Sequence, residues 1–140
     1  MQTVVAALTC AVFAILSLWH AYWACGGQLA HGAALPRKDG KPLFQPSAAG
    51  TLAVALILMA FAALAAANGG LLGLDASPAW LRWAGSAVAL ALLGRAIGDF
   101  RYVGFFKRLG EDPFARLDTR VYSPLCLLLA AGMLTAAWGG

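Results

Sequence analysis

Charge is scarce in this sequence. Only 11% of the 140 residues are charged and 61% are hydrophobic, whereas an ordinary globular domain carries about 25% charged residues. This composition excludes a typical water-soluble domain. A helix needs about 20 residues to cross the hydrocarbon core of a bilayer, so a few such runs and their connections occupy nearly all of residues 1–140. We therefore expect one integral membrane domain and no separate soluble domain.

Cysteine is also scarce, and no metal-binding pattern is present. The three cysteines, Cys10, Cys25 and Cys126, form no Cys-x-x-Cys pair and are too scattered for a zinc site. Free cysteines of this kind usually pack as small apolar residues. A signal peptide has a Lys or Arg before its apolar run. None precedes the first apolar run here, so we expect a retained helix.

Catalytic motifs are missing as well. The sequence holds no Ser-His-Asp set, no phosphate-cradling glycine loop and no His-Glu-x-x-His motif. The lack of a carboxylate in mid-membrane argues against a proton-coupled carrier. A haem with two His ligands is disfavoured, because His20 lies in an apolar run whereas His31 lies in a loop rich in Gly and Ala. The sequence identifies no cofactor.

Apolar runs predict an all-α fold, an integral membrane four-helix bundle. Ser47 can cap the second helix, Asn68-Gly69-Gly70 ends it, and Ser77-Pro78 starts the third. In the first loop, Lys38-Asp39-Gly40-Lys41 predicts a tight turn. The four predicted spans cover residues 4–23, 48–67, 80–100 and 121–138.

Basic residues are distributed unevenly between the two sides that four crossings define. Eight of them lie in the loops after the first and third spans, and the opposite side holds Arg82 as its one basic residue. The positive-inside rule places the richer loops in the cytoplasm and both termini outside, and we expect the protein in the cytoplasmic membrane. The net charge of +4 then indicates orientation and attraction to membrane lipid, with no nucleic acid partner. The loops after the first and third spans carry Arg37, Lys38, Lys41, Arg101, Lys107, Arg108, Arg116 and Arg120.

More than half of the charged residues lie in residues 95–120. If the third helix continues, Arg95, Asp99 and Tyr102 share one face, and Arg95 can pair with Asp99. An unpaired arginine at the membrane centre costs about 2.5–3.5 kcal/mol, so a partner is expected. In a helix, an ion pair four residues apart is weaker when the basic residue comes first. Asp99 could therefore accept a hydrogen bond from another helix instead.

A short interfacial helix is expected after the third span. It would lie in the inner membrane interface. Gly94 and Gly98 form a small-xxx-small pair that allows another helix to approach closely. Asp118 or Thr119 can cap the fourth span, and Asp118 is interpreted as such a cap or as a loop ion pair. The apolar side of the interfacial helix would carry Tyr102, Phe105, Phe106 and Leu109, and its polar side Arg101, Lys107 and Arg108.

Several segments together resemble a known family. They are Gly26-Gly27 after the Trp-rich first span, FQPSAAGT (44–51), GRAIGDFRYVGFFKR (94–108) and DTRVYSPLCLLL (118–129). The chain resembles the bacterial family catalogued as domain of unknown function 3995, whose members are small four-span membrane proteins. The resemblance covers nearly the whole chain and supports the architecture, and it implies no biochemistry.

These features predict a basic, aromatic vestibule at the cytoplasmic leaflet. Aromatic surface with a few fixed polar groups is typical of a small-ligand site, and positive charge there favours an anionic headgroup. The leading hypothesis is binding of a small amphiphile, namely an anionic lipid, an isoprenoid phosphate or a quinone. The predicted floor is Arg95 and Asp99, and the predicted walls are Arg101, Tyr102, His20, Trp19 and Trp23.

Two alternatives from other classes stay open. An enzyme acting on a lipid-soluble substrate would use His20 or Asp99 for proton transfer. A structural or regulatory subunit would pack against a larger membrane complex through its glycine-bearing face, as part of a homo- or hetero-oligomer. His20 and the Arg95–Asp99 pair also have purely structural interpretations, as polar contacts between helices. The sequence does not decide whether the protein is an enzyme.

Overall fold

Four long helices dominate the computed structural model, which describes residues 1–73, 78–108 and 113–139. The loop after the first helix contains a short 3₁₀ turn (His31–Ala33) and a hairpin of β1 (Arg37–Lys38) and β2 (Lys41–Pro42). A short helix, α4 (Pro113–Leu117), and a π-helical turn (Asp118–Tyr122) run directly into the last helix. The all-α prediction is therefore confirmed. The long helices are α1 (Gln2–Ala24), α2 (Ala48–Asn68), α3 (Ala79–Ile97) and α5 (Ser123–Trp138).

Local signals end the helices and turn the chain much as the sequence predicts. Ser47 caps α2, its Oγ accepting a hydrogen bond from the backbone N–H of Gly50 at 3.0 Å. In the hairpin, Asp39 and Gly40 have φ values of 52° and 75°, the positive pair that a type I′ turn requires. The predicted tight turn is therefore confirmed. Pro78 directly precedes α3, and Ser77 lies outside the described residues.

Among the residues that the structure describes, three helical segments are long and apolar enough to cross a membrane: Gln2–Ala24, Ala48–Asn68 and Pro113–Trp138. The last begins before the predicted residue 121 because α4, the π turn and α5 are continuous. Helix α3 is outside this group, since Arg82 and Arg95 lower the hydropathy of its 19 residues. The predicted third span is thus a helix that ends at Ile97, and its crossing of the membrane stays a prediction.

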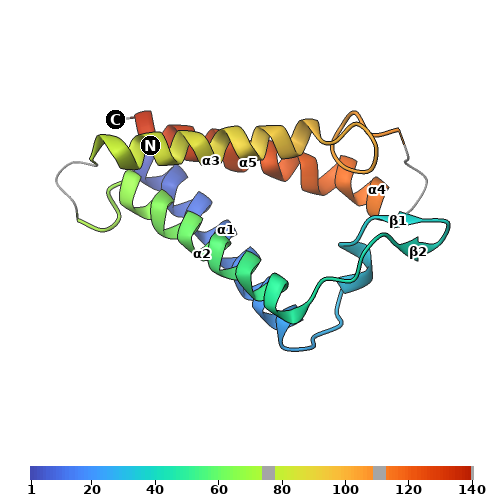
Figure 1. The fold of residues 1–140 in the computed structure, drawn as a ribbon. Coiled ribbons are helices and arrows are strands. Elements are labelled where there is room, and N and C mark those ends of the chain that lie inside the picture. Colours follow the sequence, from blue (N-terminus) through green and yellow to red (C-terminus); the bar gives the residue numbers. More distant parts are fainter. Residues whose placement is uncertain (74–77, 109–112, 140) are drawn as a thin grey trace.

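The helices form two antiparallel pairs that meet at one end and diverge toward the other (Figure 1). Helix α1 packs along α2, and α3 packs along α5. Both termini lie where the pairs meet, and the loops after α1 and α3 lie at the open end. The arrangement is a V, more open than a bundle packed along its whole length.

Small residues bring the two pairs together at the closed end. A Cβ on Gly132 would meet the side chain of Thr9, and a Cβ on Gly69 would meet Ala6. Lipid gives helices no hydrophobic drive to associate, so such close packing replaces it. The predicted glycine face is a different one, because a Cβ on Gly94 would meet no atom within 4 Å. The buried core of this end comprises Phe13, Ala62, Ala65, Val88, Ala89, Leu129, Ala130 and Met133.

The predicted interfacial helix is displaced along the chain. Residues 98–108 form turns and bends, because Gly98 takes a φ of 90° and ends α3. The short helix that does follow is α4, and Leu109 of the predicted apolar side lies outside the described residues. The expected helix cap at Asp118 or Thr119 is wrong, since both residues lie inside the continuous helix that ends in α5.

Replacing Gly132 by Ala tests the close packing at the closed end. The new methyl group overlaps Thr9, and overpacking of this kind costs about 1–3 kcal/mol. Gly94→Ala is the matched control, because it adds the same methyl group to a helix where nothing lies within 4 Å. Unfolding in mixed micelles, followed by circular dichroism, should show a loss of stability for G132A alone. Equal stability of the two variants would contradict this packing.

Candidate functional site

Asp118 lies at the centre of a buried ionic cluster. Its side chain is 0% exposed, and Oδ1 accepts a hydrogen bond from Nη2 of Arg95 at 2.8 Å. Oδ2 accepts from Nζ of Lys107 at 3.0 Å and from the backbone N–H of Gly104 at 2.7 Å. One carboxylate therefore joins the end of α3, the following loop and the start of the last helix. The paired charges and the backbone donor offset part of the cost of burying the carboxylate, and among the described residues Nη1 of Arg95 is buried without a hydrogen-bond partner.

Lys107 is enclosed almost as completely, with its side chain only 5% exposed. Its ammonium group donates to the Gly104 carbonyl at 2.9 Å, to Asp118 at 3.0 Å and to Oγ1 of Thr119 at 2.6 Å. An ammonium group has three N–H donors, so all are used within the protein. The cluster therefore acts as an internal tie, and its lysine has no donor left for a ligand.

Asp99 is not the partner of Arg95, and the predicted pair is wrong. Its Oδ1 accepts hydrogen bonds from three backbone N–H groups that follow it. The predicted pair requires α3 to continue through Asp99, but the helix ends at Ile97. Burial raises the pKa of Asp99, but the backbone donors together lower it below its ordinary value of 3.8. The donors are Arg101 at 2.9 Å, Tyr102 at 2.7 Å and Val103 at 3.0 Å.

Two glycines allow this loop to fold back on the end of α3. Gly98 and Gly104 both have a φ of 90°, a conformation that other residues rarely adopt. A Cβ on Gly98 would meet the carbonyl of Val103, and a Cβ on Gly104 would meet the carbonyl of Ile97. The closed loop presents the N–H of Gly104 to Asp118. Gly98 therefore serves loop closure and not a contact between helices.

The structure does not gather the predicted vestibule residues in one place. Of the predicted floor, Arg95 belongs to the ionic cluster, and Asp99 accepts the hydrogen bonds that close the loop after α3. Arg101 is exposed, and its guanidinium lies 5.2 Å from the ring centre of Tyr102. Trp19 lines a separate shallow groove on α1. The remaining two residues line a cavity elsewhere: His20 and Trp23.

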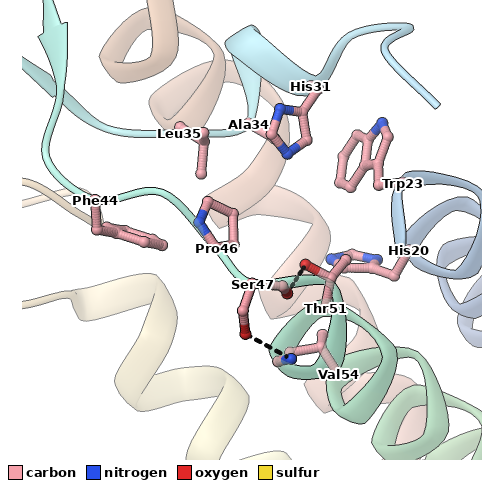
Figure 2. A pocket seen from close by; sticks show the side chains of 11 residues that line it. His20, Trp23, His31, Ala34, Leu35, Phe44, Pro46, Ser47, Thr51 and Val54 are labelled. Carbon is pink, nitrogen blue, oxygen red and sulfur yellow. Dashed lines mark hydrogen bonds between the residues drawn. The ribbon is translucent and has the colours of Figure 1, made fainter. Parts of the chain in front are cut away.

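That cavity lies at the open end of the α1–α2 pair, beneath the loop that joins these helices (Figure 2). Its volume is about 410 Å³, within the range of small-molecule sites. No Lys, Arg, Asp or Glu occurs among the described residues that line it. The apolar walls are Trp23, Ala34, Leu35, Phe44, Pro46, Gly50 and Val54, and the polar groups are His20, His31, Ser47 and Thr51.

Both histidines reach the cavity because the loop folds back over the end of α1. The ring of Trp23 lies 5.1 Å from that of His20 and 5.6 Å from that of His31, centre to centre. The indole N–H of Trp23 donates to the Leu29 carbonyl at 2.8 Å, which fixes the ring. Nδ1 of His20 lies 2.8 Å from the Leu16 carbonyl. A carbonyl only accepts, so in the neutral ring Nδ1 carries the proton and Nε2 is an acceptor.

The loop that covers the cavity is anchored to the other helix pair. The hydroxyl of Tyr122 donates to the Ala33 carbonyl at 3.3 Å, and the Tyr122 ring packs 5.9 Å from that of Phe114. The loop therefore bridges the open end of the V. Figure 1 shows β1 and β2 beside α4, on the far side of the opening from α1.

Sequence reasoning found part of these groups. The interpretation of Asp118 as a cap or a loop ion pair is confirmed only for the ion pair, which lies inside the continuous helix, and its partners Arg95 and Lys107 were not predicted. One signal in the sequence could have indicated this pair. Arg95 needs an anionic partner, and Asp118 is a carboxylate near the start of the fourth span. His31, Ser47 and Thr51 were not recognised as neighbours of His20. No cluster of three or more metal-ligating side chains occurs among the described residues.

Comparison with known proteins gives one match. The family described as "Protein of unknown function (DUF3995)" matches residues 3–133. No match was found among curated proteins or among solved structures.

Replacing Asp118 by Asn tests the ionic cluster. The change leaves Arg95 and Lys107 without a counter-charge, and breaking a buried pair in this way costs about 3–5 kcal/mol. Asp39→Asn is the matched control, because Asp39 lies exposed in the hairpin turn, where Asn also tolerates a positive φ. Unfolding in mixed micelles should show this loss of stability for D118N alone. A similar stability of both variants would contradict a structural role for the cluster.

The lowered pKa of Asp99 makes the stability of the folded loop depend on pH. Because its pKa is lowered in the folded protein, its contribution to stability is fully present above about pH 4, near the pKa of an unfolded Asp. That contribution is lost as the pH falls through the lower, folded pKa. Carbon NMR of the Asp carboxyl groups should show Asp99 titrating at lower pH in the protein than in a peptide of residues 96–106. Identical titration in both samples would exclude the observed loop closure in solution.

Proposed function

The chain belongs to the DUF3995 family, and we propose that it binds a small amphiphile in the cavity between α1, α2 and their connecting loop. The membrane in this proposal is the bacterial cytoplasmic membrane, with both termini outside and the cavity at the inner leaflet. Helix α3 crosses beside α5, giving four crossings. The ligand places its apolar part against the aromatic wall and its polar group near the histidines.

The distribution of charge supports this orientation. The loops after α1 and α3 share one end of the molecule (Figure 1). Exposed cations at that end include Lys38, Lys41, Arg101 and Arg108, whereas the opposite end carries Arg82. Cytoplasmic loops concentrate Lys and Arg in this way. The same cations attract the anionic lipid of the inner leaflet.

The cavity itself is the observation that carries the proposal. It combines a volume of about 410 Å³ with aromatic walls and a few convergent polar groups, which is the usual composition of a ligand site. In the part of the chain that the structure describes, Nε2 of His20 has no hydrogen-bond partner. An acceptor on the lining of an apolar cavity is available to a ligand that carries a donor. The site thus lies with His20 and Trp23, away from the ionic cluster of Arg95.

An enzyme is the second candidate, and His20 is the residue that favours it. Its fixed Nδ1 leaves Nε2 as a free base in the cavity, the arrangement that a general base requires. Asp99, the other group considered, is committed to three backbone donors in the loop after α3. Turnover in this protein would therefore depend on His20 and not on Asp99.

Filling the cavity tests the binding proposal. Val54 lines the cavity and is 41% exposed, so Val54→Trp places a large apolar side chain there without removing a polar group. Native mass spectrometry of the gently extracted protein should detect a bound small molecule in the wild type and lose it in V54W.

Leu56→Trp is the matched control for this variant. Leu56 lies on the same helix, is 65% exposed and does not line the cavity, so L56W should keep the bound molecule. No bound molecule in any of the three proteins, or equal occupancy in V54W and L56W, would contradict the proposal.

A further inference from the structure

We infer that the cavity takes an uncharged ring amphiphile whose hydroxyl group donates a hydrogen bond to Nε2 of His20, as a quinol does, and not a phosphate ester. This inference rests on the proposed binding function and names the chemical class of the ligand. It excludes two of the three classes that the composition alone allowed, the anionic lipid and the isoprenoid phosphate, and within the third it favours the reduced quinol over the quinone. The support comes from the polar groups that line the cavity.

The first support is the orientation of the His20 ring. The Leu16 carbonyl lies 2.8 Å from Nδ1, so in the neutral imidazole the proton is held there and Nε2 presents a lone pair. His20 is half-buried and lines the cavity. This lone pair accepts from a ligand that carries a donor, and a phosphate diester or a quinone carbonyl has none, whereas a phosphate monoester is disfavoured by its charge. A phenolic hydroxyl supplies a donor.

The second support is the lack of positive charge. Among the described residues of the lining there is no Lys or Arg, the residues that usually pair with phosphate. An anion placed against Trp23, Phe44 and Val54 would lose its hydration without a counter-charge. Lys107 and Arg95 do not line the cavity and are paired with Asp118. A neutral polar group avoids this cost.

The third support is the shape and the remaining donor of the cavity. Figure 2 shows Trp23 and Phe44 on opposite sides of the group of lining residues, an arrangement that suits a flat ring. The oxygen of Ser47 accepts from the Gly50 N–H at 3.0 Å, and its hydroxyl proton is free to turn toward a ligand oxygen. Nε2 of His20 and the hydroxyl of Ser47 thus offer one acceptor and one donor along the lining of the cavity, which suits a ring with two oxygen substituents.

The redox state of a single probe tests the inference. Decylubiquinol and decylubiquinone share one skeleton, but only the quinol has hydroxyl protons. Calorimetric titration of the protein in nanodiscs, without oxygen, should show the wild type binding the quinol about tenfold more tightly than the quinone, the effect of one hydrogen bond of ordinary strength. Dodecyl phosphate, the anionic probe, should bind at least tenfold more weakly than the quinol.

Two variants of His20 assign the preference to its ring. His20→Leu removes the acceptor and should reduce the quinol-to-quinone ratio to about one, whereas His20→Gln restores an acceptor and should recover part of it. The ratio is measured within each protein, so a general loss of stability does not imitate the effect. Trp80→Leu, at the opposite end of the molecule and 66% exposed there, is the control and should keep the wild-type ratio.

The outcomes separate this inference from the proposed function. A ratio near one in the wild type, an unchanged ratio in H20L, or dodecyl phosphate binding as tightly as the quinol overturns the assignment of a hydroxyl donor. In those cases the binding proposal stands if V54W still abolishes binding of the probe. Absence of binding of all three probes overturns the inference, and the bound molecule sought by native mass spectrometry then decides the binding proposal separately.

Discussion

A buried carboxylate that neutralises two cations is the interaction on which this structure depends. Asp118 joins Arg95 of α3, Lys107 of the following loop and the start of the last helix. Without it, two positive charges would face an apolar interior, where an unpaired charge is expensive. The tie holds the open end of the α3–α5 pair in one arrangement. That arrangement in turn supplies Tyr122, which holds the loop over the cavity.

The sequence was sufficient for the four long helices and insufficient for the short helix after α3 and for the contacts between distant segments. Apolar runs, Ser47 as a cap and the Asp39-Gly40 turn are local signals, and each predicted its element. The Arg95–Asp99 pair failed because Gly98, whose φ of 90° no periodicity reveals, ends the helix between them. Asp118 lies 23 residues from Arg95, so only the folded loop brings them together. The cavity could not be predicted for the same reason, because His31 lies near His20 only once the loop after α1 has folded back over the helix end.

The segments that carry the family resemblance fall on two different parts of the molecule. Segments 94–108 and 118–129 supply the ionic cluster and its loop, and these residues serve the stability of the fold. Segment 44–51 instead supplies cavity wall, through Phe44, Pro46, Ser47, Gly50 and Thr51. The most charged part of the chain is therefore an internal tie, and the candidate ligand site is nearly free of charge. Charge density alone pointed to the α3–α5 pair, whereas the cavity lies at the same open end of the V on the α1–α2 pair.

The most direct test of this account is a double-mutant cycle between Arg95 and Asp118. The free energy of unfolding in mixed micelles would be measured for the wild type, Arg95→Met, Asp118→Asn and the double variant. The account predicts that the two changes couple by about 1–3 kcal/mol, because either one alone already breaks the pair. Additive effects, with a coupling energy of zero within error, would contradict the claim that this carboxylate and this guanidinium hold the structure together.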